Sequence, residues 1–135
     1  MIKFQHENLI RFATDLFVKV GLPEDRATVT ACTLVESDLM GHSTHGLALL
    51  SPYLESASKG KMKLSGNPII LRDTGASIAW DGQYLPGPWL VHQAIDLAFE
   101  RITQHPVVTM TIQKSHHIGC LASYPERATE MGLMM

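Results

Sequence analysis

The hydrophobic pattern changes its period once along the chain, near Gly66, and this change restricts the fold more than any other feature. Before it, apolar side chains recur at the three- and four-residue spacing of amphipathic helices. After it, short strand-like runs are bounded by turn residues. The sequence therefore predicts a helical part followed by a part that contains a sheet.

The first part is predicted to hold three helices. The first covers about residues 5–20, and its apolar positions follow a helical period: Leu9, Phe12, Ala13, Leu16, Phe17 and Val20. A second helix is expected to begin at Pro23, a residue favoured in the first turn, and to run to Gly41. A third is expected over about 46–59. We assign residues 1–62 to this helical segment, which carries one candidate site loop.

The second part is predicted to open a sheet domain. Residues 68–72 and 77–80 are strand-like runs, and the turn residues 73–76 between them indicate a hairpin. A helix is expected over about 88–104. The apolar run 107–112 then predicts a buried strand.

A last helix is predicted around Tyr124 and Ala128, with Pro125 either kinking it or marking its first turn. The fold class is therefore α/β: an N-terminal helical layer followed by the beginning of a mixed α/β sheet domain, residues 63–135. Because the apolar residues after Gly132 lie where another strand is expected, we expect the chain to be truncated.

Charge and composition exclude several partners. The 135 residues carry 11 Lys and Arg against 13 Asp and Glu, a formal net charge of −2, with the basic residues scattered. This gives no electrostatic basis for binding nucleic acid or an anionic membrane. No apolar run approaches the roughly 20 residues that cross a bilayer, and no signal-peptide pattern opens the chain. Cys32 and Cys120 fit neither a disulfide framework nor a metal spacing, so we expect a cytoplasmic protein.

Two short, glycine-bounded loops hold four of the seven histidines. Residues 41–46 read Gly-His-Ser-Thr-His-Gly and lie between two predicted helices. Residues 114–119 read Lys-Ser-His-His-Ile-Gly and follow a predicted strand. Small-molecule sites form in such loops. Histidine suits them because its ordinary pKa of about 6.5 allows proton exchange near neutrality.

Three roles are open for these histidines. They could be structural, capping helices or filling polar corners. They could bind a metal, with His42 and His45 on one helical face and His116 or His117 as a third ligand. The spacing is not that of a zincin, so we expect no bound metal. They could also exchange a proton with a carbonyl or an alcohol.

The loop sequences resemble a known family. Residues 38–46, Asp-Leu-Met-Gly-His-Ser-Thr-His-Gly, are similar to the signature of the malate/L-lactate dehydrogenase family, which also contains ureidoglycolate, sulfolactate and piperideine-carboxylate oxidoreductases. The order of later residues resembles it too: Tyr53, Gly60, Asp81-Gly82, Gly87, 115–119 and Tyr124. Two separated motifs in the right order make the resemblance specific, and it covers essentially the whole chain.

The resemblance implies an oxidoreductase that transfers a hydride between NAD or NADP and a small 2-hydroxy acid or 2-oxo acid of the malate or lactate type. Family enzymes are much longer, are generally homodimers, and bind the cofactor without the Rossmann fingerprint, which this sequence lacks. The chain is then an N-terminal fragment. Residues 63–135 would be the first part of the cofactor-binding domain, with most cofactor-binding residues beyond residue 135.

The resemblance also assigns site residues. It implies that His117 is the acid/base and that His45 lies at the substrate beside the nicotinamide. The hydroxyl of Thr44 would hydrogen-bond substrate or His45. The substrate-binding set comprises Thr44, His45, Lys114 and His116.

One position departs from the family pattern. Many members carry an arginine four residues after the first histidine of the motif, where it binds a substrate carboxylate in bidentate fashion. This chain has Leu49 there. The carboxylate would then be bound by Lys114 or by a group beyond residue 135, or the substrate differs.

Two alternatives remain at this stage. The first is a catalytically inactive truncated fragment with a structural or self-association role, because a sheet without its remaining strands exposes an edge and an apolar face. The second is a metal-dependent hydrolase that uses the histidine loops. The specific hydroxy acid, the choice between NAD and NADP and the direction of reaction are not encoded in these residues.

Overall fold

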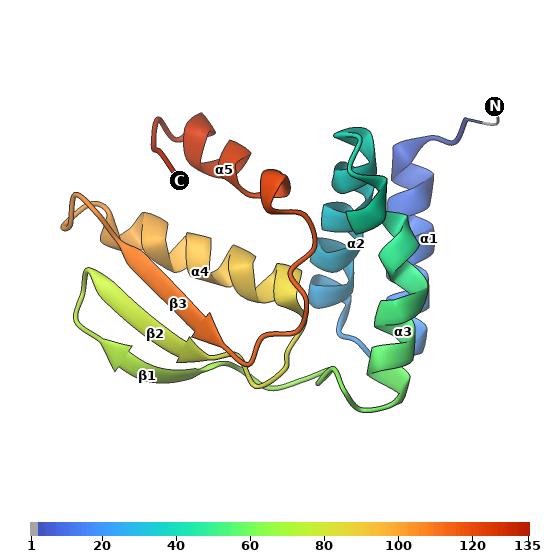
Figure 1. The fold of residues 1–135 in the computed structure, drawn as a ribbon, viewed down its shortest axis with the longest axis horizontal. Helices are drawn as coiled ribbons and strands as arrows, with labels where there is room; N and C mark the ends of the chain where they lie inside the picture. The colour runs from blue at the N-terminus through green and yellow to red at the C-terminus, as the bar shows by residue number, and fades with distance from the viewer. Residues whose placement is uncertain (1–2) are drawn as a thin grey trace.

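The computed structural model describes residues 3–135 and shows a helical layer beside a small mixed sheet (Figure 1). The helical layer contains α1 (His6–Lys19), α2 (Glu24–Leu39) and α3 (Leu50–Ser58). The second part contains β1 (Ile69–Asp73), β2 (Ser77–Asp81), α4 (Gly87–Arg101), β3 (Thr109–Gln113) and α5 (Pro125–Glu130). The predicted α/β fold class, with helices first and a mixed sheet after them, is confirmed.

The helical layer has its own core, formed where the apolar faces of α1, α2 and α3 meet. Its buried members are Ala13, Phe17, Leu22, Ala27, Ala31, Leu34, Leu50, Tyr53 and Met62. The presence of Met62 in this core shows that the chain leaves the helical layer close to the predicted division at residue 62. That division stays a prediction.

The third predicted helix begins later than expected. Two short 3-10 turns, η1 (Ser43–His45) and η2 (Leu47–Leu49), precede α3. The carboxylate of Asp38 accepts a hydrogen bond of 2.8 Å from the backbone N–H of Leu47, and a Cβ at position 46 would overlap that carboxylate. This side-chain contact fixes the backbone at Gly46. Residues 46–49 therefore do not continue the predicted α-helix, which begins only at Leu50.

The sheet has the order β1-β2-β3. Strands β1 and β2 form the predicted antiparallel hairpin, in which the backbone N–H of Gly75 donates to the carboxylate of Asp73 at 2.9 Å. Strand β3 pairs parallel to β2, and α4 makes the crossover between them. Helix α4 covers one face of the sheet, where Ala94 packs against Ile78 and Trp80.

The prediction of a buried strand over 107–112 is wrong in its burial. Strand β3 alternates between exposed and half-buried residues. It lies at the edge of the sheet and is covered by α4 on one face only, so an apolar run is not sufficient to bury it.

Pro125 is the first residue of α5 and opens that helix, one of the two alternatives predicted. Among residues 3–135, no helix combines the length and apolarity that a membrane crossing requires.

Candidate active site

The two histidine loops lie together in the fold. His45 comes from η1, between α2 and α3, and His117 comes from the loop that follows β3. Their ring centroids are 5.8 Å apart and their planes differ by 26°, which is a stacked arrangement. One small polar group could therefore contact both imidazoles.

The start of α4 positions the second loop. A Cβ at Gly87 would lie 2.5 Å from the carbonyl oxygen of His116 and closer still to that of His117. The backbone N–H of His116 also donates to the carbonyl of Leu85 at 3.2 Å. Only glycine permits this approach of helix and loop, so Gly87 sets the position of His117.

Tyr53 contacts His117 and is almost fully buried, with 2% of its surface exposed. Its hydroxyl oxygen lies 2.7 Å from Nδ1 of His117 and 3.1 Å from the carbonyl oxygen of the same residue. Its ring also meets the ring of His116 edge-on, with centroids 5.1 Å apart. Burial raises the pKa of the Tyr53 hydroxyl, so this group keeps its proton at neutral pH.

Tyr53 was not among the predicted site residues, although the family resemblance included it in the order of matching positions. A sequence signal was available. Tyr53 lies on the same helical face as Leu50 and Ala57, which are buried, and a buried tyrosine hydroxyl needs a polar partner. The identity of that partner could not be derived from the sequence.

The backbone after His117 contributes a further contact. The N–H of Gly119 donates to Nδ1 of His117 at 3.1 Å, and Gly119 has a φ of +75°. This φ lies in the region that glycine adopts without steric cost. The turn at Gly119 therefore directs a backbone donor at the imidazole.

Both histidines of the second loop favour the neutral state. Burial lowers the pKa of His117, and the neighbouring His45 lowers it further. Burial also lowers the pKa of His116, and His117 adds to this effect. Among the described residues, Nδ1 of His116 is buried without a hydrogen-bond partner. The His116 ring packs edge-on against the Tyr53 ring.

Thr44 precedes His45 in η1 and contacts its ring. The hydroxyl oxygen of Thr44 is 3.0 Å from Nδ1 of His45, and both residues are exposed. A hydroxyl can either donate or accept a hydrogen bond at this position.

Lys114 has a different partner. Its ammonium group donates to the carboxylate of Asp81 at 2.9 Å. The Asp81 carboxylate also accepts hydrogen bonds from Gln83 and Gln113. The bond from Lys114 and the backbone N–H of Gln83 lower the pKa of Asp81 to about 2. A carboxylate-binding role for Lys114 would require it to leave Asp81 or to bridge both carboxylates.

The other positions complete the comparison with the sequence predictions. Leu49 is half-buried against the helical core and carries no charge toward the site. His42 lies at the start of η1 and is exposed. Within residues 3–135, no three His, Cys, Asp or Glu side chains converge in a way that could hold a metal ion. The proposed metal set of His42, His45 and His116 or His117 is therefore not assembled there.

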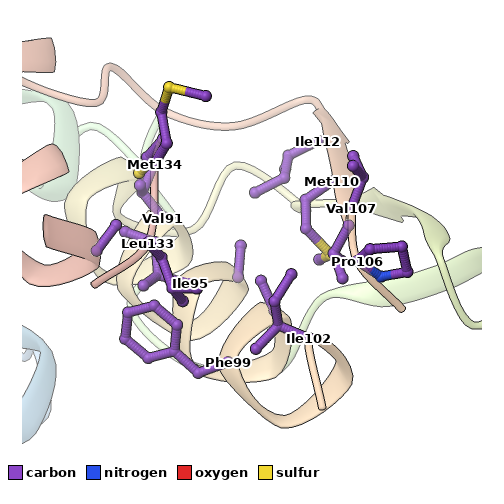
Figure 2. A pocket seen from close by; sticks show the side chains of 15 residues that line it. Val91, Ile95, Phe99, Ile102, Pro106, Val107, Met110, Ile112, Leu133 and Met134 are labelled. Carbon is purple, nitrogen blue, oxygen red and sulfur yellow. The ribbon is translucent and has the colours of Figure 1, made fainter. Parts of the chain in front are cut away.

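An apolar cavity of about 520 Å³ lies elsewhere, between α4, β3 and the residues after α5 (Figure 2). It is lined mainly by aliphatic and aromatic side chains, among them Ile95, Phe99 and Met110. No histidine lines it, so this cavity is separate from the imidazole pair.

The lowered pKa values predict how stability depends on pH. His92, His116 and His117 all have folded-state pKa values below the ordinary 6.5. As the pH falls below 6.5, the unfolded chain binds protons that the folded chain does not, so the free energy of unfolding should decrease. Glu36, whose pKa is raised by burial, acts in the opposite direction nearer its ordinary value of 4.5.

Urea unfolding at constant ionic strength, at steps from pH 7.5 to about 5.5, measures this effect. A free energy of unfolding that stays constant or increases across that range would contradict the lowered pKa values of these three histidines.

Comparisons with known proteins bear on the chemistry of this site. A family described as malate/L-lactate dehydrogenase matches residues 4–135. The chain is 28% identical over 132 residues to hydroxycarboxylate dehydrogenase B of Escherichia coli O157:H7. This alignment covers 98% of this chain and 37% of that protein. It is 30% identical over 125 residues to an L-lactate dehydrogenase of Cupriavidus necator, covering 93% of this chain and 36% of the relative.

Solved structures match over the same extent. Malate dehydrogenase from Pyrococcus horikoshii OT3 superimposes with a TM-score of 0.93 at 25% identity, over 97% of this chain and 38% of that one. Sulfolactate dehydrogenase from Methanocaldococcus jannaschii gives a TM-score of 0.91 at 25% identity, over 96% and 38%. The chain thus spans about 37% of the length of the first curated relatives that it matches.

Proposed function

The chain belongs to the malate/L-lactate dehydrogenase family, and on this premise we propose that it forms part of an NAD- or NADP-dependent 2-hydroxyacid dehydrogenase. The reaction would transfer a hydride between the cofactor and a small 2-hydroxy acid or its 2-oxo acid. The stacking of the His45 and His117 rings, with centroids 5.8 Å apart, is the observation that supports this proposal, because two imidazoles this close could both contact one substrate oxygen. Since the chain spans about 37% of its relatives, the activity is proposed for the full-length protein.

The chemistry of the site supports this cofactor class. When bound, the nicotinamide would supply the hydride, and the protein would supply orientation and the proton. The hydrogen bonds given above for the rings of His45 and His117 are all made at Nδ1, so Nε2 of each ring is the atom proposed to meet the substrate oxygen. Most residues that bind the cofactor are proposed to lie in the part of the relatives that this chain does not span.

The residues of this chain would act on the substrate oxygen. The imidazole pair would contact the oxo group, and Thr44 would orient His45 or the substrate. The sequence-based proposal gives the acid/base role to His117, and such catalysis typically contributes about 10²–10⁴-fold to the rate. Lys114 and His116 remain proposed substrate-binding residues, and homodimeric assembly and a cytoplasmic location remain proposals as well.

A substrate screen of the full-length protein tests the function. Oxidation of NADH and of NADPH would be followed with a panel of small 2-oxo acids, and the reverse reaction with the matching 2-hydroxy acids. We expect turnover with at least one pair, and strong loss of turnover when both His45 and His117 are replaced by alanine. The matched control is His6→Ala, which removes an exposed histidine of α1. Full activity in the double variant would overturn the proposed site.

The 135-residue chain by itself has a second proposed behaviour, which is self-association without turnover. The apolar cavity between α4 and β3 favours it, together with Met134, whose surface is 97% exposed. Sedimentation velocity over a range of concentrations measures this directly. A monomer at every concentration would remove the proposal.

A further inference from the structure

Helix α2 is buried on two faces that differ in chemistry. One face is apolar and belongs to the core that α2 shares with α1 and α3. The other face is polar, and its members recur at the spacing of one helical face: Arg26, Thr30, Thr33 and Ser37, all of them buried. A buried polar face of this kind has to satisfy its hydrogen-bonding groups within the protein.

The hydroxyl groups of this face bond mainly within α2 itself. Thr30, Thr33 and Ser37 each donate to a backbone carbonyl one turn earlier in the helix. Ser37 also lies 3.3 Å from the hydroxyl oxygen of Ser123, two residues before α5, so this face meets the second part of the chain. Among the four residues, Arg26 is the one whose donors reach outside α2.

The guanidinium of Arg26 joins three segments. One of its nitrogens donates to the carbonyl of Gly66 at 2.6 Å, and another lies 3.5 Å from the carbonyl oxygen of Leu64. Its central carbon Cζ lies 4.0 Å from the centroid of the Trp89 ring, within the range of a cation–π contact. Arg26 therefore ties α2 both to the connection between the two parts and to the first turn of α4, which lies beside α2 in Figure 1.

The burial of Arg26 makes these contacts necessary. Its side chain belongs to a residue that is only 8% exposed, and none of the ion pairs among residues 3–135 includes it. A buried charge is costly unless other groups replace its hydration. Burial accordingly lowers the pKa of Arg26, against a smaller opposite effect of Asp25. The Trp89 ring and the two carbonyls supply the replacement only while α2 and α4 are in contact.

The turn of α4 that Arg26 contacts is also the turn that positions the second histidine loop. Trp89 follows by two residues the glycine at position 87, where a Cβ would overlap the loop carbonyls. His45 belongs to the helical layer and follows α2, whereas His117 moves with the start of α4. A shift of this turn relative to α2 would therefore change the distance between the two imidazoles.

We infer that Arg26 is a positioning residue, which clamps the first turn of α4 and residues 64–66 onto α2 and thereby sets the distance between the rings of His45 and His117 without contacting either ring. The effect on turnover rests on the proposed dehydrogenase function, whereas the effect on the ring geometry does not. Contacts such as that between Ser37 and Ser123 do not involve Arg26, so its loss should displace the two parts and not separate them.

Proton spectra of the histidine rings in the 135-residue chain test the geometry. Because the rings of His45 and His117 stack, each ring affects the proton resonances of the other. Arg26→Met keeps an unbranched apolar stem but removes the charge and the donors. We expect the ring-proton resonances of both histidines to move and the cross-relaxation between the rings to weaken, with assignments from their loss in His45→Gln and His117→Gln.

Two controls separate positioning from general destabilisation. Arg11→Met removes an exposed arginine of α1, which donates to Asn8. Ile78→Val removes a buried methyl group from the core between the sheet and α4, away from the polar face of α2, and lowers stability. Both variants should leave the ring resonances in place. Unchanged resonances in Arg26→Met, or equal changes in Ile78→Val, would overturn the inference.

Arg26→Lys provides the test if Arg26→Met fails to fold. A lysine keeps a charge that can lie over the Trp89 ring, but it lacks the planar fork that reaches the ring and the carbonyls together. We expect smaller movements of the same His45 and His117 resonances than a full loss of the clamp would cause. Wild-type resonances in Arg26→Lys together with wild-type resonances in Trp89→Leu would overturn the clamp.

Kinetics of the full-length protein test the consequence for the proposed reaction. Misplacement of a reacting group by about 1 Å can cost about 10²-fold in rate, so Arg26→Met should lower kcat by up to about that factor, with a smaller change in KM. Arg26→Lys should recover part of the loss. A wild-type kcat in Arg26→Met would overturn the positioning role. If no variant and no wild-type protein shows dehydrogenase activity, the proposed function fails, and the ring resonances alone decide whether Arg26 sets the geometry.

Discussion

Gly87→Ala is expected to displace the loop that carries His117 and to lower both stability and activity. The added Cβ would lie within 2.5 Å of the carbonyl oxygen of His116 and closer to that of His117, and these are backbone atoms that cannot rotate away. Overpacking of this kind typically costs about 1–3 kcal/mol of unfolding free energy. Because His117 moves with its carbonyl, the stacking with His45 should also be lost.

Urea unfolding of the chain measures the first effect, and kcat of the full-length protein measures the second. Gln93→Ala is the matched control, because Gln93 is an exposed residue of the same helix, and a surface substitution there should stay within about 0.5 kcal/mol. Wild-type stability together with wild-type turnover in Gly87→Ala would show that α4 does not position the loop as described.

His45→Ala in the full-length protein is expected to produce a large loss of activity. Because His45 is proposed to contact and orient the substrate oxygen beside His117, its removal should lower kcat by about 10²–10³-fold. The side chain is exposed, so the free energy of unfolding should change little.

His6→Ala serves as the control for histidine removal, and Thr44 provides a graded comparison. Thr44→Ser keeps the hydroxyl that meets Nδ1 of His45 and should keep most of the activity, whereas Thr44→Val removes it and should lower kcat. A His45→Ala protein with wild-type kcat would remove His45 from the proposed site.

The sequence predicted the local elements well because they depend on residues close together in the chain. The helical period over 5–20 corresponds to α1, and the turn residues 73–76 join the β1–β2 hairpin. The misplaced start of the third helix has a physical reason that the period could not reveal. The Asp38 carboxylate binds the backbone of Leu47 and fixes two 3-10 turns there.

The candidate site could be predicted only in part from the sequence. The sequence placed His45 and His117 in loops and paired them through a family resemblance. It contained no information about the distance between the rings, nor about the Asp81 carboxylate that engages Lys114. The contact between Gly87 and the loop carbonyls also had no signature beyond the glycine itself.

The sequence alone determined which segments become helices and strands and which loops carry the imidazoles, because hydrophobic period and turn chemistry act over a few residues. Only the tertiary structure decided that β3 lies at the edge of the sheet that these residues form, that the two rings stack, and that Nδ1 of His117 lies close to Gly119 and Tyr53. These properties depend on residues far apart in the chain. Tyr53 and His117 are separated by 64 positions and meet because α3 and the loop after β3 pack together.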